Sequence, residues 1–176
     1  MKKLTYILLV CVLLGLTGCN SKEEAIAETR EVLCEEAGVQ FTLNGLWIEQ
    51  EGDDKEDGNG REVVLNVYQE ETGSGIQIVC EDLTRTEGGT LVRMDDYVAG
   101  FQEQLKISGQ YQYSCGDIST EMLYGNSYET FGASVAELNA KQQYYIRRQD
   151  DTMIIMVITV FGEEKKEDIL ALGKEM

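Results

Sequence analysis

The feature that most constrains the fold is an apolar run near the C-terminus, TMIIMVITVF, from Thr152 to Phe161. A strand with one face in water alternates apolar and polar residues, whereas a strand buried on both faces is apolar at nearly every position. The run therefore predicts a central strand that is covered on both faces by other parts of the chain.

Alternating apolar residues predict further strands before this run. One strand is expected around Val63, Leu65 and Val67, and a second over 76–80 after a glycine-rich turn. Residues 39–50 are also expected to be extended. Turns are predicted at Asn44-Gly45, Gly73-Ser74-Gly75, Gly125-Asn126, Leu138-Asn139 and Asp150-Asp151, and the last three mark a long antiparallel meander.

Helical periodicity is clearest over residues 94–106. Asp95 and Asp96 lie at its N-terminal end, where the helix dipole favours negative charge. A final helix is predicted over 164–176, and residues 21–38 are expected to form either a tether or a short helix. The apolar face of the first helix consists of Tyr97, Val98, Phe101 and Leu105.

This order of elements is strands, a helix, consecutive antiparallel strands and a closing helix. Helices packed on a mostly antiparallel sheet form an α+β sandwich. The sequence therefore predicts a single α+β domain over 39–176, with a mostly antiparallel β-sheet flanked by helices.

The N-terminus has the pattern of a bacterial lipoprotein signal. Lys2 and Lys3 precede an apolar run over 4–16, which is too short to span a bilayer but suits a signal-peptide core. The run ends in LTGC, residues 16–19, which resembles the lipobox whose cysteine receives a diacylglyceryl group before cleavage.

We therefore predict a signal peptide over 1–18, lipidation of Cys19, and a tether or short helix over 19–38. Two or three acyl chains anchor a protein stably in a bilayer, whereas one does not. The domain is then expected outside the cytoplasm, lipid-anchored to a membrane. The alternatives are an ordinary core helix, or a conventional signal peptide in which Cys19 is incidental.

Charge and composition exclude several classes of function. With 15 Lys and Arg against 32 Asp and Glu, the formal net charge is −17, so nucleic acid is not an expected partner. The sequence has no histidine, which excludes Ser-His-Asp and Cys-His catalysis and zinc sites built on histidine. The acidity favours solubility beside a negative membrane; a cationic partner or a divalent metal is the alternative.

Three cysteines follow Cys19, namely Cys34, Cys80 and Cys115. Cys80 and Cys115 each alternate with apolar or aromatic residues, so both are expected to point into a core as small hydrophobic side chains. A Cys80–Cys115 disulfide is the main alternative, and redox or metal chemistry is a weaker one.

The acidic loop EGDDKEDGNG, residues 51–60, is the best candidate for a metal site. Oxygen ligands of the kind that calcium prefers are supplied by Asp53, Asp54, Glu56, Asp57 and Asn59. Counted from Asp53, however, Lys55 and Val64 occupy positions three and twelve, where an EF-hand needs acidic ligands. A solvated hairpin loop and weak calcium binding are both open interpretations.

Other groups of polar and aromatic residues are better explained by a structural role than by catalysis or binding. Asp95 and Asp96 are interpreted as helix-terminal residues, and a pair of facing carboxylates carries little information among 32 acids. Strand tyrosines are interpreted as cross-strand packing, with a stacking surface for a sugar or peptide as the alternative. They are Tyr111, Tyr113, Tyr124, Tyr128, Tyr144 and Tyr145.

From residue 41 onward the chain resembles the PsbP/Mog-type fold of small bacterial lipoproteins. The resemblance is carried by DDYVAGFQEQLK, YGNSYETFGAS, AKQQYYIRRQDDTMIIMVITVF and KKEDILAL, in that order. It departs after Trp47, where the acidic loop replaces a Pro-Gly-Trp turn. PsbP steadies a large membrane complex and helps it retain inorganic cofactors, and the Mog-type protein binds a small GTPase. The resemblance implies a binding or assembly scaffold with no shared catalytic motif.

The expected function is therefore that of a lipid-anchored, non-catalytic binding or accessory domain of the cell envelope, without a cofactor. Its partners would be the bilayer, through Cys19, and an envelope protein. Binding of a small ligand or calcium is the first alternative, and a hydrolase that uses two carboxylates is the second.

Overall fold

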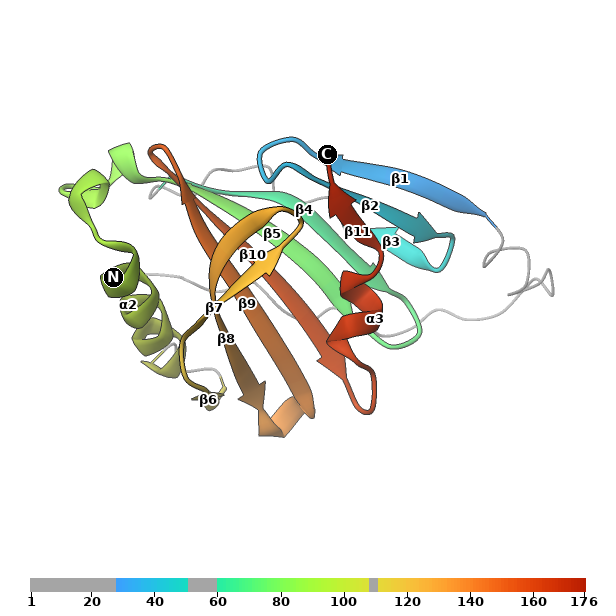
Figure 1. The fold of residues 1–176 in the computed structure, drawn as a ribbon. Helices are drawn as coiled ribbons and strands as arrows, with labels where there is room; N and C mark the ends of the chain where they lie inside the picture. Colours follow the sequence, from blue (N-terminus) through green and yellow to red (C-terminus); the bar gives the residue numbers. More distant parts are fainter. Residues whose placement is uncertain (1–27, 51–59, 108–110) are drawn as a thin grey trace.

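The computed structural model describes residues 28–50, 60–107 and 111–176. A large sheet lies at its centre. A small three-stranded sheet and a short helix cover one face of the large sheet, and the long helix α2 covers part of the other (Figure 1). Both covering layers that the apolar run predicts are thus present.

The large sheet runs in the order β3-β4-β5-β10-β9-β8-β6, with β7 paired to the first half of β8. Its strands are β3 (Trp47–Glu49), β4 (Arg61–Gln69), β5 (Gly75–Asp82), β6 (Tyr113–Cys115), β7 (Ser119–Leu123), β8 (Asn126–Val135), β9 (Ala140–Gln149) and β10 (Thr152–Phe161). The apolar run is β10, and it pairs antiparallel with β5 and β9. The prediction of a central strand is confirmed.

The small sheet runs in the order β1-β2-β11, and the short helix α3 lies on the same face of the large sheet. These elements are β1 (Thr29–Cys34), β2 (Val39–Asn44), α3 (Lys166–Leu170) and β11 (Gly173–Glu175). Alternate residues of β2 point inward, and Val39, Phe41 and Leu43 are fully buried. They pack against Ile154 and Met156 of β10 in the first of two hydrophobic clusters.

Helix α2 (Met94–Ile107) covers the opposite face and matches the predicted helix over 94–106. Val98 is fully buried, and Phe101 packs against Phe131 and Tyr144 of the sheet. In this second cluster β10 contributes the residues that alternate with its first-cluster set, which explains why the strand is apolar throughout. They are Met153, Ile155 and Val157.

The predicted tether or short helix over 21–38 is wrong for its described part. Residues 29–34 form β1, which pairs antiparallel with β2, so that the domain begins before residue 39. A hairpin turn ending at Gly38, whose φ is 65°, joins the two strands. Pairing with β2 and burial of Cys34 outweigh the weak helical preference of the Glu-rich segment.

The predicted closing helix over 164–176 is also wrong in length. Helix α3 spans only Lys166–Leu170, and the chain then returns to β2 as strand β11. A Cβ atom at Gly173 would lie 2.5 Å from the Tyr124 ring and 2.9 Å from the Phe41 ring. Only glycine permits this close approach, so a glycine is required at position 173 for the chain to pair with β2 as β11.

The predicted turns are confirmed to within a residue or two. Tyr124 and Gly125 join β7 to β8 with φ of 48° and 73°, and Asn139 and Asp150 have φ of 50° and 53°. Within the described ranges no helix is both long enough and apolar enough to cross a membrane.

Candidate functional site

The most distinctive local feature of the large sheet is a fork between β8 and β9. The two strands are paired from Val135↔Ala140 to Glu129↔Ile146, and the pairing ends there. Beyond this point β8 pairs only with β7, and β9 pairs only with β10. Two neighbouring strands therefore part while each continues in another ladder.

The ladder register shows which backbone groups point into the fork. In antiparallel pairs the backbone N–H and C=O groups that face one neighbour recur at every second residue. Two-residue turns close the β7–β8 and β9–β10 hairpins on Leu123↔Asn126 and Gln149↔Thr152. Ser127 of β8 and Arg148 of β9 consequently turn their backbone groups toward the fork, where the β8–β9 ladder no longer supplies a partner.

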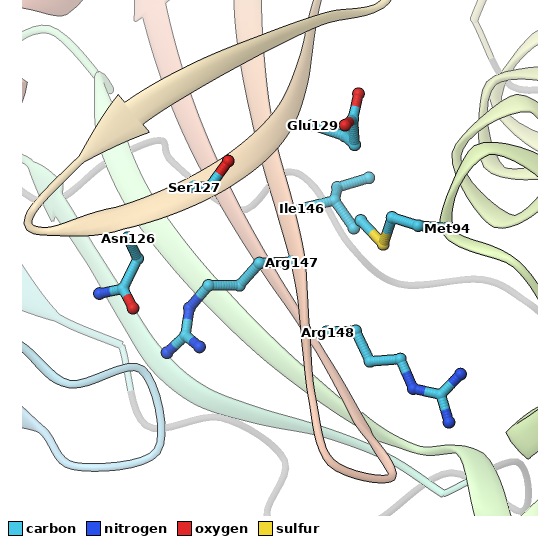
Figure 2. Close-up of a pocket in the computed structure, with 7 residues that line it drawn as sticks. All are labelled: Met94, Asn126, Ser127, Glu129, Ile146, Arg147 and Arg148. Carbon is cyan, nitrogen blue, oxygen red and sulfur yellow. The ribbon is translucent and has the colours of Figure 1, made fainter.

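A hollow of about 340 Å³ occupies this fork. Met94 of α2 and Ile146 are its apolar part, and polar side chains come from both strands (Figure 2). The hollow is open to solvent, so a ligand could enter it without movement of the backbone. Its polar lining residues are Asn126, Ser127, Glu129, Arg147 and Arg148.

Arg147 is half-buried, and its hydrogen-bond acceptors among the described residues are all neutral. Its Nε donates to the Tyr128 hydroxyl (3.3 Å), Nη1 to the Gln149 amide oxygen (2.9 Å) and Nη2 to the Ala37 carbonyl (3.0 Å). Nη1 and Nη2 each carry a second N–H. Neutral acceptors thus hold this guanidinium in place, and no carboxylate of the described residues is paired with it.

Arg148 has a different, structural position. It donates to the carbonyl oxygens of Asp150 (2.7 Å), Thr90 (2.9 Å) and Val92 (3.2 Å), and it is 3.4 Å from an Asp151 carboxylate oxygen. These contacts tie the loop before α2 to the β9–β10 turn. Figure 2 shows its guanidinium directed away from that of Arg147.

Glu129 is the one carboxylate among the residues that line the hollow. It accepts a hydrogen bond from the Thr120 hydroxyl (3.1 Å). Because Glu129 and Ile146 are paired, their side chains lie on the same face of the sheet, which is the α2 face. Arg147 contacts Ala37 on the other face, so the acid and the guanidinium are separated by the sheet.

A second open hollow, of about 410 Å³, lies where β1 and β2 meet the segment between α3 and β11. Its lining residues are uncharged except for Lys174. Lys174 is 3.7 Å from Glu31 and is therefore already paired. The fork is the better candidate for a binding site.

A buried carboxylate that sequence reasoning did not single out links α2 to the sheet. Glu81 of β5 has 7% of its surface exposed, and it accepts hydrogen bonds from Arg61 Nε (2.8 Å) and the Tyr97 hydroxyl (2.6 Å). Burial and the Glu81 carboxylate raise the pKa of Tyr97, so its hydroxyl stays protonated as a donor. The three groups satisfy one another, as a buried charge requires, and their role is to hold α2 in place.

The cysteines are free thiols in the described chain. Cys80 is buried in the first cluster, as predicted, whereas Cys115 is half-buried against the second cluster on the other face. The alternative of a Cys80–Cys115 disulfide is therefore wrong. Burial raises the pKa of Cys34 to about 11 and that of Cys80 to about 12, so both thiols are inert near neutral pH.

The residues predicted to carry chemistry before residue 60 lie outside the described ranges. They are the lipidation site Cys19 and the candidate calcium ligands Asp53, Asp54, Glu56, Asp57 and Asn59. Lipidation and calcium binding thus stay predictions. Within the described ranges there is no group of three or more acidic or cysteine side chains arranged to hold a metal ion.

The strand tyrosines lie mainly in the core, as the packing interpretation predicts. Tyr128 and Tyr145 meet edge to face at 6.1 Å in the first cluster, and Tyr144 stacks on Phe131 at 4.7 Å in the second. Asp95 lies in the first turn of α2 and is paired with Arg93 at 2.8 Å. Among these residues, Tyr128 contacts the fork: its hydroxyl accepts from Arg147, and its ring lies 5.7 Å from the Arg147 guanidinium carbon.

Comparison with known proteins identifies the fold. No protein-family model and no curated protein matches the chain. The chain is similar to the solution structure of cyanobacterial PsbP (CyanoP) from Synechocystis sp. PCC 6803, with a TM-score of 0.57 and 12% identity, over 93% of this chain and 99% of that one. A crystal structure from Bacteroides thetaiotaomicron VPI-5482 aligns with a TM-score of 0.43 and 11% identity, over 85% of this chain and 49% of that one. The likeness to CyanoP confirms a PsbP-like α+β fold.

Proposed function

We propose that this chain is a non-catalytic binding domain, lipid-anchored on the outer side of a membrane, that holds a partner protein through the β8–β9 fork. The observation that carries the proposal is the fork itself. In the fork, the backbone groups of Ser127 and Arg148 have no partners in the β8–β9 ladder. The charged guanidinium of Arg147 lies beside them. Strand edges of this kind recognise extended polypeptide segments in other proteins.

The predicted location supports a partner in the cell envelope. Cys19, at the end of the apolar N-terminal run, would anchor the chain, and a short segment would separate the lipid from β1. A PsbP-like fold is compatible with many functions, so the proposal rests on the fork more than on the fold.

The proposal is tested by site-specific photo-cross-linking in cells. A photoreactive amino acid replaces Ser127, at the fork, or Glu137, an exposed residue near the far end of the β8–β9 ladder. We expect Ser127 to give one reproducible cross-linked protein that is absent with Glu137. Equal products at both positions, or no product at Ser127, would contradict a partner at the fork.

A further inference from the structure

The fork has a shape that selects how a polypeptide could enter it. It is open where β8 and β9 are apart and closed where they join at Glu129↔Ile146. An extended segment lying between the two strands would therefore meet a paired ladder at one end and could not continue. A chain terminus fits such a dead end better than the middle of a chain.

The charges around the fork favour binding of a C-terminus over binding of an N-terminus. The acceptors that surround Arg147 are neutral, and planar guanidinium groups bind carboxylates with two parallel hydrogen bonds. A terminal ammonium would instead be repelled by Arg147. The Glu129 carboxylate, which would attract an ammonium, lies on the opposite face of the sheet.

The net charge of the molecule limits the rest of the partner segment. A protein with a formal net charge of −17 repels a strongly acidic chain, although salt screens this repulsion beyond about 8 Å at physiological ionic strength. A single terminal carboxylate on an otherwise neutral or basic segment avoids most of the repulsion and still reaches Arg147.

We infer that the fork captures the C-terminus of an extended partner polypeptide, with the terminal carboxylate on Arg147 and the backbone of the segment between Ser127 and Arg148. The inference rests on the proposed function and names its ligand chemistry. Asn126, which lies on the Arg147 side of the hollow in Figure 2, supplies a further polar side chain near the carboxylate position.

The test uses two peptide libraries that differ in one group. Both contain random-sequence hexapeptides with acetylated N-termini; one has free C-terminal carboxylates, and the other has C-terminal amides. Each is titrated into the isotopically labelled, detergent-solubilised full-length protein, and backbone amide shifts are followed by NMR. We expect the free-acid library to shift the Ser127 and Arg148 signals at concentrations at least about tenfold lower than the amide library.

Variants assign the effect to the guanidinium. Arg147→Gln should abolish the difference between the libraries, and Arg147→Lys should retain part of it because the charge remains. Lys141→Gln makes the same change of charge on the same strand, outside the hollow, and should leave the difference intact. If Arg147→Gln fails to fold, the comparison of the two libraries on the wild-type protein still tests whether a free C-terminal carboxylate is preferred, and equal responses would overturn the inference.

Two results would overturn the inference: equal responses to both libraries, or a free-acid preference that survives Arg147→Gln. If a partner is cross-linked at Ser127 but the libraries respond equally, the proposed function stands and the C-terminal mode fails. If the free-acid preference is found but no partner is cross-linked in cells, the recognition chemistry stands and the proposed function fails.

Discussion

At the scale of single residues, two arginines and one glutamate show how differently charge is used in this molecule. Arg61 is matched to the buried Glu81, whereas Arg147 is held by neutral oxygen acceptors. A buried carboxylate without partners would cost several kcal/mol, so Glu81 requires both Arg61 and Tyr97. Arg147 is not paired with a buried acid among the described residues, and in the proposed function its charge attracts the ligand.

The Glu81 network predicts a clear stability effect. Glu81→Gln removes the buried negative charge that accepts hydrogen bonds from Arg61 and Tyr97, and we expect a loss of about 2–4 kcal/mol in the free energy of unfolding. Tyr97→Phe should lose about 1–2 kcal/mol, because one charge-assisted hydrogen bond disappears. The matched control is Glu62→Gln on the exposed side of β4. Urea unfolding measures all three, and a Glu81→Gln variant as stable as the Glu62→Gln control would contradict the role of the network.

The buried thiols predict how stability changes at alkaline pH. The ordinary thiol pKa is 9.0, and burial raises it to about 11 for Cys34 and about 12 for Cys80. Above pH 9 these thiols ionise in the unfolded chain before they ionise in the folded one, so stability falls as pH rises toward 12. We expect Cys80→Ala to reduce the steepness of this fall in urea unfolding measured from pH 8 to pH 11. A slope identical to that of the wild type would show that Cys80 is not protected by burial.

At the scale of elements, the strands and helices with strong periodicity were predictable and the weakly patterned ends were not. β10 is apolar at nearly every position because it packs on both faces. α2 has a regular apolar stripe because it packs on one face. β1 has only Val32 and Cys34 turned inward, and its strand character comes from pairing with β2. The segment after α3 forms a strand although Ile169, Leu172 and Met176 share helical spacing, which is why its sequence predicts a helix.

The fork could not be predicted from the sequence for a related reason. β8 and β9 both continue as regular strands beyond Glu129↔Ile146, so neither contains a local break signal. What changes is the partner of each strand, which is a long-range property. The arginine pair was visible in the sequence, but its contacts with Ala37 and Thr90 depend on segments far away along the chain.

Two glycines, one in α2 and one at the start of β11, are expected to respond in opposite ways to substitution by alanine. Gly173→Ala places a methyl group against the Tyr124 and Phe41 rings and disturbs the 2.6 Å hydrogen bond from Tyr124 to Leu170, so we expect a loss of about 1–3 kcal/mol. Gly100→Ala lies in α2 with no atom within 4 Å of the new Cβ, and it should gain about 0.5–1 kcal/mol. Thermal unfolding compares the two. Equal effects would show that β11 is not tightly docked on β2.

At the scale of the whole molecule, a predicted lipid anchor at Cys19 is combined with a large sheet whose fork is the proposed binding site. The formal net charge of −17 disfavours anionic polymers, whereas the hollow in the fork is lined by two arginines and one glutamate. The fork belongs to the large antiparallel sheet of the PsbP-like fold. In the proposed function, recognition at the fork depends on a few residues of β8 and β9.

The predicted lipoprotein signal implies that Cys19→Ser releases the protein from the membrane. The wild type should incorporate radiolabelled palmitate and sediment with membranes, whereas Cys19→Ser should do neither, because serine lacks the thiol that is alkylated. Cys11→Ser, within the apolar run, is the control and should behave as the wild type. Label in the Cys19→Ser variant would exclude Cys19 as the attachment site.

The most direct test of the central claim is the yield of the Ser127 cross-link in cells when the guanidinium is removed. The photoreactive residue at position 127 is combined with Arg147→Gln or with Lys141→Gln, and the amount of partner attached is measured by mass spectrometry. If the fork holds the partner through Arg147, Arg147→Gln should lower the yield at least about tenfold, and Lys141→Gln should leave it unchanged. An equal yield in both variants would contradict the claim that the fork holds the partner through Arg147.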